Sequence, residues 1–501
     1  MNPSPHLPSP HRPPPHLPPH WKQALLLAAT VFISCIYFYE GGGWNQNSRF
    51  DLVRAIVERH TLQIDAFHEN TQDKAYFQGH YYSDKAPGLV FLAVPFFAVA
   101  RPVLRMAGVD PESPRGEFEL SYLVGAGSVA LPIALAAMCV FLLCLRFGAD
   151  VSGAAFATLV MCVGTPLWAY ASLFWAHALV GACLVFALAA AMKLAPGQNN
   201  FLWALAVGLA AGWATVTEYP AAPASAILAV FAVSRVWKDK DGGARLRAAF
   251  GIGVGAAICI AVLLGYLYAA FGSFRPSYSY YDPQSFSFMQ QQGYMGLTYP
   301  HPDRLLKLLF GCSRGLFFAS PVMLVAPVGL WWSWKQKTNR GAMLVIAAIA
   351  AYYFLFNASF YWWKAGLSFG PRYAGACIPL LCVGLSVAWS RAKRMWRIVI
   401  DMLALASVFV ALAVISTNSQ LSMQDSCPLF HQSLPAFVAG QLSLNHDSML
   451  TVTEAQSGTY GAFNLGELLG LRGLASLIPL FGLWATAAVC WWRLQRSERA
   501  E

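Results

Sequence analysis

The chain has 501 residues, of which 57% are hydrophobic and only 12% are charged. Because soluble globular domains carry about 25% charged residues, this composition excludes an ordinary soluble protein. The formal net charge is +10, but the basic residues gather in short segments between apolar runs, as in the cytoplasmic loops of membrane proteins. We therefore expect an all-α polytopic membrane protein in contact with membrane lipids, and no nucleic-acid partner.

The two ends of the chain differ from its apolar interior. Residues 1–21 are mostly Pro, His, Ser and Leu, which predicts a disordered cytoplasmic tail. The apolar run after this tail lacks a small-residue cleavage site, so we interpret it as an uncleaved first span rather than a signal peptide. Residues 493–501 form a short basic cytoplasmic tail. The interior, 22–492, is the expected transmembrane domain.

The apolar runs in this interior predict a bundle of about twelve transmembrane helices. An even number of spans places both termini on the cytoplasmic side. The expected spans lie near residues 22–40, 119–145, 152–170, 174–194, 201–217, 219–236, 247–271, 317–334, 341–357, 372–390, 398–416 and 472–492.

Four long segments between these spans are expected on the outer face. They are 41–118, 272–316, 358–371 and 417–470. In the first, apolar residues recur at helical spacing in "RFDLVRAIVERH", which predicts an amphipathic helix along the interface. The run 88–107 contains two prolines and an arginine, and is interpreted as a second juxtamembrane helix rather than a span. Cys312 and Cys427 fall in these segments and could pair, which sequence alone does not decide.

An acid and a base stand side by side in "GHYYSDKAPG", just before an apolar run. A charge at that depth is costly unless it is paired or functional. Asp84 and Lys85 could simply neutralise each other at a helix start, but the polar groups in the same segments favour a functional role. These groups are the carboxylates Asp51, Asp65 and Asp73, the cations Arg49 and Arg372, the rings of Tyr81 and Tyr82, and the intramembrane residues His177 and Glu218.

Group transfer from a lipid phosphate has two chemical requirements. A carboxylate must accept the proton of the attacking hydroxyl. Cations must stabilise the charge that builds on the departing phosphate, which Arg does bidentately and Lys as a point charge. The outer segments supply both kinds of group. The same inventory would also suit a transporter that grips a phosphate without cleaving it.

The order of loops and spans resembles the GT-C class of membrane glycosyltransferases. The likeness covers about residues 22–492 and is carried by "NQNSRFDLVRAIVERHTLQIDAF", "YYSDKAPG", "SRGLFFASPVMLV", "SFGPRYAGACIPLL" and "FNLGELLGL". It is similar above all to the bacterial family related to dolichyl-phosphate-mannose protein mannosyltransferases and lipid A aminoarabinose transferases.

The resemblance implies an inverting hexosyltransferase. It would move a sugar from a polyprenyl-phosphate donor to a glycan, lipid or protein acceptor of the cell envelope, at the periplasmic face of a bacterial inner membrane. Lys85 would hold the carrier phosphate with help from Arg372, and Tyr81 and Tyr82 would border the sugar pocket. Three further residues complete the expected binding set: Arg49, His177 and Glu218.

One departure from the relatives concerns the catalytic base. In the relatives, an acidic pair followed by "xRY" supplies the catalytic carboxylate. Placing the arginine on Arg49 puts Gln46 and Asn47 at the acidic positions, and an amide cannot act as a general base. Asp65 and Asp51 are therefore the joint catalytic candidates, with Asp84 able to share the role.

No cofactor and no metal site are expected from the sequence. Some GT-C enzymes use a divalent ion, and Asp65, Asp73 and His80 could supply ligands to one, but no ligand spacing supports this. Two other functions stay open: a transporter or flippase of polyprenyl-linked glycans, and a transferase-like protein that binds lipid-linked sugar without catalysis. Release of free polyprenyl phosphate would distinguish the transferase from both.

Overall fold

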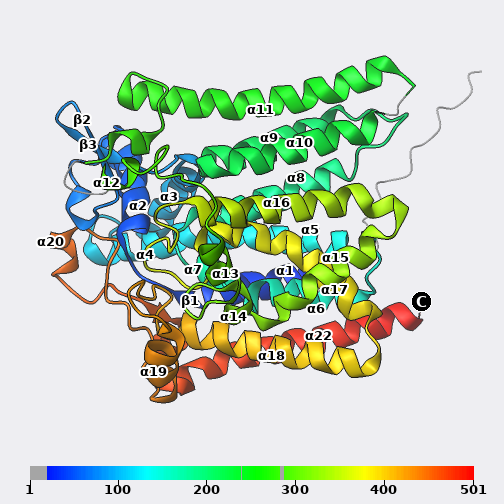
Figure 1. Ribbon diagram of the computed structural model, residues 1–501. Helices are drawn as coiled ribbons and strands as arrows, with labels where there is room; N and C mark the ends of the chain where they lie inside the picture. Colours follow the sequence, from blue (N-terminus) through cyan, green and yellow to red (C-terminus); the bar gives the residue numbers. More distant parts are fainter. Residues whose placement is uncertain (1–19, 238–239, 283–286, 501) are drawn as a thin grey trace, which may run out of the picture.

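The computed structural model describes residues 20–237, 240–282 and 287–500, so nearly all of the expected tail at 1–21 lies outside the described residues. The chain folds into a bundle of roughly aligned helices (Figure 1). The bundle helices are α1 (Trp21–Ile36), α4 (Pro114–Gly125), α5 (Leu131–Arg146), α6 (Val151–Val163), α8 (Ala176–Ala191), α9 (Phe201–Thr217), α10 (Ala222–Val236), α11 (Gly242–Phe271), α15 (Ala326–Trp334), α16 (Arg340–Ser359), α17 (Ile378–Arg391), α18 (Arg394–Thr417) and α22 (Ile478–Ala500).

The remaining helices and the strands connect the bundle helices. They are α2 (Trp44–Arg59), α3 (Gly88–Met106), α7 (Leu167–Ser172), α12 (Ser287–Gln290), α13 (Pro302–Phe310), α14 (Leu316–Ala319), α19 (Leu434–Val438), α20 (Val452–Ala455), α21 (Leu465–Leu468), and the strands β1 (Phe38–Tyr39), β2 (Lys74–Phe77), β3 (His80–Ser83) and β4 (Phe463–Asn464). Most of them gather at one end of the bundle, at the left of Figure 1, which we call the loop end. The C-terminus lies at the opposite end.

Nine helices in the described part of the chain are long and apolar enough to cross a membrane, and four shorter apolar helices accompany them. Eight of the nine coincide with expected spans, and the four shorter ones lie at the remaining four. The protein is therefore a multi-pass membrane protein, and the number of about twelve spans stays a prediction. Near 152–170 a single expected span is broken into α6 and α7.

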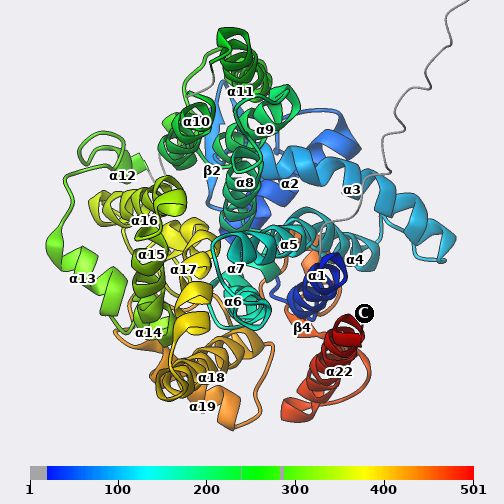
Figure 2. The same cartoon turned by 90° about the vertical axis from the view of Figure 1, so that its right-hand side faces the viewer.

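The ninth candidate is α3, the segment interpreted as a juxtamembrane helix. It is 19 residues long and apolar enough to span. In Figure 2, however, α3 is drawn lengthwise whereas α1 and most bundle helices are viewed close to end-on. α2 likewise stands across the bundle at the loop end (Figure 1). Both helices therefore run across the direction in which the spans run.

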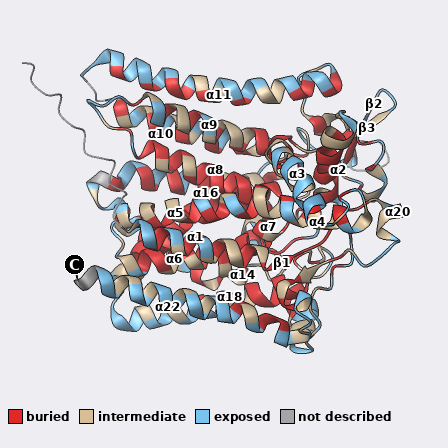
Figure 3. Cartoon of the chain, turned by 180° about the vertical axis from the view of Figure 1, so that it is seen from behind, coloured by how far each residue is buried: buried red, intermediate tan, exposed pale blue. Residues whose placement is uncertain are grey.

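Burial varies strongly between the helices. In the span that contains α8, 83% of an apolar 18-residue stretch is buried, whereas in the span that contains α22 only 17% of such a stretch is buried. Figure 3 shows this contrast as a red interior with pale-blue outer helices such as α11 and α22. The exposed apolar side chains of α22, including Ile478 and Phe481, have the character expected of a lipid-facing surface.

Close approach of α9 and α11 depends on glycine. A Cβ atom on Gly208 would lie 2.2 Å from the carbonyl oxygen of Ile252, and one on Gly255 would lie 2.5 Å from that of Leu205. Side chains at these positions would push the two backbones apart. Small residues at such crossings allow transmembrane helices to pack tightly.

The sequence did not lead us to expect the strands. β2 and β3 form an antiparallel hairpin in which Lys74 pairs with Ser83 and Phe77 with His80. Its two-residue turn places Gln78 at φ 50° and Gly79 at φ 88°. Two positive φ angles are the requirement of a type I′ turn, which favours glycine. The register brings Asp73 and Asp84, the residues flanking the paired strands, to the same end of the hairpin.

A disulfide joins two of the loops at this end. Cys312 is bonded to Cys427, with their Cα atoms 4.9 Å apart. The pairing that the sequence left open is therefore present in the structure. It ties the segment before α14 to the segment before α19.

Candidate functional site

The candidate site is a polar centre at the loop end, beside the hairpin. Lys85, directly after β3, places its Nζ 2.8 Å from Oδ2 of Asp84 and 2.8 Å from Oδ2 of Asp73. The Asp84 side chain is fully buried, whereas those of Lys85 and Asp73 keep 16% and 13% exposure. Burial raises the pKa of Asp84, and the charge of Lys85 opposes this rise. Lys85 is therefore held between two carboxylates, of which Asp73 is the more exposed. We call Asp73, Asp84 and Lys85 together the Lys85 fork.

A second part of the centre is a chain of charged and polar groups. Nη2 of Arg49 lies 3.7 Å from Oε1 of Glu218, and the other Glu218 oxygen lies 2.8 Å from Nδ1 of His177. Nε2 of His177 accepts a hydrogen bond from Nε of Arg372 at 2.8 Å. Burial acts to raise the pKa of Glu218, but His177 and the two arginines hold it below its usual value.

The two arginines are incompletely neutralised. Nε of Arg49 is buried and has no hydrogen-bond partner among the described residues. Burial lowers the pKa of Arg49, and Arg372 adds to this effect while Glu218 opposes it. Arg372 stacks on the ring of Trp175, with its guanidinium carbon 3.9 Å from the ring centroid, and also donates to the carbonyl of Ala365. An anion placed between these guanidinium groups would relieve their mutual repulsion.

The Lys85 fork lies close enough to the series formed by Arg49, Glu218, His177 and Arg372 for their charges to interact. Arg49 is attracted by both Asp84 and Asp73, besides Glu218. Six of the expected site residues therefore come together here: Arg49, Asp84, Lys85, His177, Glu218 and Arg372.

Gln46 and Asn47, the amides at the two positions where the resemblance implied acids, are buried and fully used in local structure. Gln46 accepts from Nε1 of Trp175 at 2.9 Å and donates to the carbonyl of Gly42. Asn47 accepts from the amide of Gly43 and donates to the carbonyls of Asn70 and Ser448. Each side chain must both donate and accept, which an ionised carboxylate cannot do.

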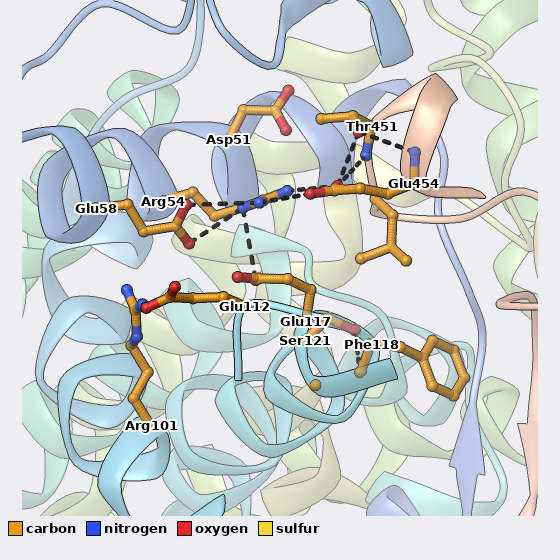
Figure 4. Close-up of polar contacts among 12 residues, drawn as sticks. Asp51, Arg54, Glu58, Arg101, Glu112, Glu117, Phe118, Ser121, Thr451 and Glu454 are labelled. Atoms are coloured by element: carbon orange, nitrogen blue, oxygen red, sulfur yellow. Dashed lines mark hydrogen bonds and ion pairs between the residues drawn. The ribbon is translucent and has the colours of Figure 1, made fainter. Parts of the chain in front are cut away.

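Asp51, one of the expected bases, lies in a different environment. It is fully buried, accepts from Nδ2 of Asn70 at 3.2 Å, and leaves its other oxygen without a partner in the described structure. Burial raises its pKa well above the usual value. Figure 4 places Asp51 beside Arg54, and no contact links it to Lys85.

Arg54 is the centre of a separate ionic cluster. It holds Glu454 bidentately at 2.9 and 3.0 Å, and lies 3.2 Å from Glu58 and 3.5 Å from Glu117 (Figure 4). These residues come from α2, α4 and α20. The cluster therefore fastens the last loop to the first, and sequence reasoning did not find it.

Asp65, the other expected base, is on the exposed side of the hairpin. Its side chain is 41% exposed, lies 2.7 Å from Nδ1 of His80 and accepts from the amide of Tyr81. Its contacts fasten the turn before the hairpin to β3. The catalytic roles of Asp51 and Asp65 stay predictions that no contact with the Lys85 fork supports.

The two expected sugar-pocket tyrosines make packing contacts. Tyr81 stacks on the ring of His68, with centroids 3.9 Å apart, and lies under the ammonium group of Lys74. Tyr82 is buried with its ring 5.0 Å from that of Phe271. Neither ring contacts Lys85 or Arg372. Their predicted role likewise stays a prediction.

Asp73 was not among the expected catalytic or binding residues, yet it contacts Lys85 directly. A sequence signal for it exists: the triplet Asp-Lys-Ala occurs at 73–75 and again at 84–86, at matching ends of the paired strands. Across the described residues, no group of three or more His, Cys, Asp or Glu side chains could hold a metal ion. Of the three suggested ligands, Asp65 bonds His80 whereas Asp73 binds Lys85.

Comparison with known proteins gives a structural likeness only. No protein-family model matches the chain, and no curated protein matches its sequence. Among solved structures, the aminoarabinose transferase ArnT from Cupriavidus metallidurans bound to undecaprenyl phosphate aligns with a TM-score of 0.52 at 17% identity, covering 94% of this chain and 77% of ArnT.

Two further similar structures have TM-scores below 0.5. Apo ArnT from the same organism aligns at 0.49 with 15% identity, over 94% of this chain and 76% of ArnT. The oligosaccharyltransferase AglB from Archaeoglobus fulgidus aligns at 0.44 with 13% identity, over 80% of this chain and 56% of AglB. The fold assignment rests on the first structure alone. This chain has the fold of a GT-C membrane glycosyltransferase.

Proposed function

We propose that the protein is an inverting glycosyltransferase that moves a hexose from a polyprenyl-phosphate carrier to an acceptor of the cell envelope. The observation that carries this proposal is the convergence of Arg49, Lys85 and Arg372 at the loop end of a membrane bundle. A likeness in fold to ArnT, whose structure contains undecaprenyl phosphate, supports a lipid phosphate as the anion.

Lys85, Arg372 and Arg49 each have a separate role in binding the donor phosphate. Lys85 binds the donor phosphate as a point charge and draws the leaving group away from the sugar. Arg372, which lies over the ring of Trp175 and donates from Nε to His177 and from Nη1 to Ala365, presents its other N–H groups to the phosphate oxygens. Arg49 supplies the buried Nε–H that has no partner among the residues that the structure describes. Asp84 orients Lys85 in the absence of donor.

The disulfide supports an outward-facing site. Disulfides persist in oxidising compartments such as the bacterial periplasm and are rare in the cytosol. The Cys312–Cys427 bond lies among the loops at the loop end. At the opposite end, short basic segments such as 335–340 and 391–397 follow the positive-inside pattern. We therefore assign the loop end to the periplasmic side of a bacterial inner membrane.

A transfer assay with purified protein tests the proposal. The donor is a radiolabelled polyprenyl-phosphate hexose, and the acceptor is a cell-envelope extract. Losing one phosphate contact should lower the rate about 10²-fold, so we expect Lys85→Ala and Arg372→Ala to be nearly inactive. Arg304→Ala, which removes a guanidinium at the start of α13 outside the centre, is the matched control. Donor that binds but is never cleaved by the wild type would exclude a transferase and point to a transporter.

A further inference from the structure

We infer that Asp73 is the general base that activates the acceptor hydroxyl, an inference that rests on the proposed function. The three carboxylates of the candidate site, Asp73, Asp84 and Glu218, differ in whether they have an oxygen that no other group occupies. A base needs an oxygen that is open to an incoming hydroxyl and close to the reacting phosphoryl sugar.

Asp84 and Glu218 do not meet this requirement. The Asp84 side chain has no exposed surface, one oxygen binds Lys85 at 2.8 Å, and the other lies 3.4 Å from the hydroxyl of Ser48. Glu218 uses one oxygen for His177 and the other for Arg49. Both carboxylates hold cations in position.

Asp73 differs from both in geometry. Its Oδ2 lies 2.8 Å from Nζ of Lys85, whereas its Oδ1 has no hydrogen-bond or ion-pair partner within the described part of the chain. Its side chain is 13% exposed, against 0% for Asp84. The side chain of Glu218 is 17% exposed, but each of its oxygens faces a partner, His177 or Arg49. A donor phosphate bound to Nζ of Lys85 would therefore share this ammonium group with Asp73, whose Oδ1 is open to an incoming hydroxyl.

The β2–β3 hairpin fixes the position of Asp73 relative to Lys85. Asp73 precedes β2 and Asp84 follows β3, and the pairing of Lys74 with Ser83 sets the two acids at one end. The amide of Asp73 is also held by the hydroxyl of Thr71 at 3.0 Å. The base and the phosphate-binding lysine are thus fixed by the same short sheet.

The chemical step is balanced as follows. The acceptor oxygen forms a bond to the anomeric carbon while the bond from that carbon to the phosphate oxygen breaks. Its electron pair leaves with polyprenyl phosphate, whose charge Lys85 neutralises. The hydroxyl proton moves to Oδ1 of Asp73 and is later released to water. One displacement of this kind inverts the anomeric centre.

The test compares Asp73→Asn with Asp73→Glu in full-length protein. Removing a general base lowers kcat typically 10²–10⁴-fold, so we expect a loss of about that size in Asp73→Asn, with Kd for the donor changed less than about threefold. Asp73→Glu should retain more activity because it keeps a carboxylate. Asp303→Asn, which removes an exposed acid paired with Lys307 at 3.3 Å, is the matched control.

Azide distinguishes a lost base from a lost binding site. It attacks the anomeric carbon without giving up a proton, so it should restore release of polyprenyl phosphate in Asp73→Asn and do little for Lys85→Ala. A kcat of Asp73→Asn within about tenfold of wild type would overturn the assignment, because a base contributes more than that. A wild type that releases no carrier with any acceptor would instead refute the proposed function.

Discussion

Arg372 donates from Nε to Nε2 of His177 at 2.8 Å. Since arginine can only donate, Nε2 must be unprotonated, and the proton of a neutral imidazole lies on Nδ1, 2.8 Å from Glu218. His177 therefore links a guanidinium to a carboxylate while staying neutral itself. It fixes the angle at which Arg372 faces the centre.

Replacing His177 tests this link. His177→Leu leaves Nε of Arg372 and one oxygen of Glu218 unpaired, so we expect donor affinity to fall about tenfold, or about 1.4 kcal/mol. His177→Gln can still accept from Arg372 and donate to Glu218, and should recover part of the loss. Equilibrium binding of labelled donor in detergent measures both.

The control for this series is His431→Gln. His431 is 59% exposed and binds Asp425 at 2.7 Å, so it pairs with a carboxylate outside the centre. Its replacement should leave donor binding unchanged. Wild-type affinity in both His177→Leu and His177→Gln would show that Arg372 is positioned by other contacts.

Gln46→Glu tests whether the amide has become structural. A carboxylate would still accept from Trp175 but would face the carbonyl of Gly42 without a proton to donate. We expect the variant to lose about 1–3 kcal/mol of stability and to gain no transfer activity. Thermal unfolding and the transfer assay measure these. A stable and more active variant would mean that position 46 can hold a catalytic carboxylate.

Much of the architecture could be predicted from sequence because the signal is local. A run of about twenty apolar residues is enough to predict a membrane span, as in the stretch that forms α16. The charged pair Asp84–Lys85 was also visible, since charges beside apolar runs are rare. α3 shows the limit, because hydropathy alone would make it a span, and only the two prolines and the arginine within it suggested otherwise.

The rest depended on contacts between distant segments. Arg54 meets Glu454 across 400 positions of sequence, and no local pattern pairs them. Asp65 looked as suitable a base as any other carboxylate until its bond to His80 placed it outward. Asp73 was named only as one of several carboxylates and as a possible metal ligand, because the hairpin that brings it to Lys85 was not expected. The Gln-Gly turn of that hairpin, between aromatic runs, is nevertheless a recognisable signal.

Arg54→Met tests the ionic cluster that fastens α2 to α20. The change leaves Glu117, which is 1% exposed, without its cation. Breaking a buried ion pair by removing one partner costs about 3–5 kcal/mol, so a clear fall in the unfolding temperature is expected. Arg115→Met is the control, since Arg115 is 75% exposed and its pair with Glu119 should contribute less than about 1 kcal/mol. Equal unfolding temperatures would rule out a stabilising role for the cluster.

Glu40 gives a pH dependence whose sign is defined. Burial raises its pKa from 4.5 to about 8, although Ser419 donates to it. A carboxyl whose pKa is raised on folding stabilises the fold most below its unfolded pKa, and loses that stabilisation as pH rises from about 4.5 to about 8. Glu40→Gln removes this titration. The variant's unfolding temperature should therefore gain on the wild type between pH 5 and pH 8; a constant difference would contradict the raised pKa.

The most direct test of the central claim counts products in proteoliposomes. Purified protein receives a polyprenyl-phosphate hexose labelled in both sugar and lipid, together with an envelope acceptor. We expect one free polyprenyl phosphate for each sugar that reaches the acceptor, with both products absent in Lys85→Ala. Donor that crosses the bilayer intact, or stays bound and uncleaved in the wild type, would contradict a glycosyltransferase.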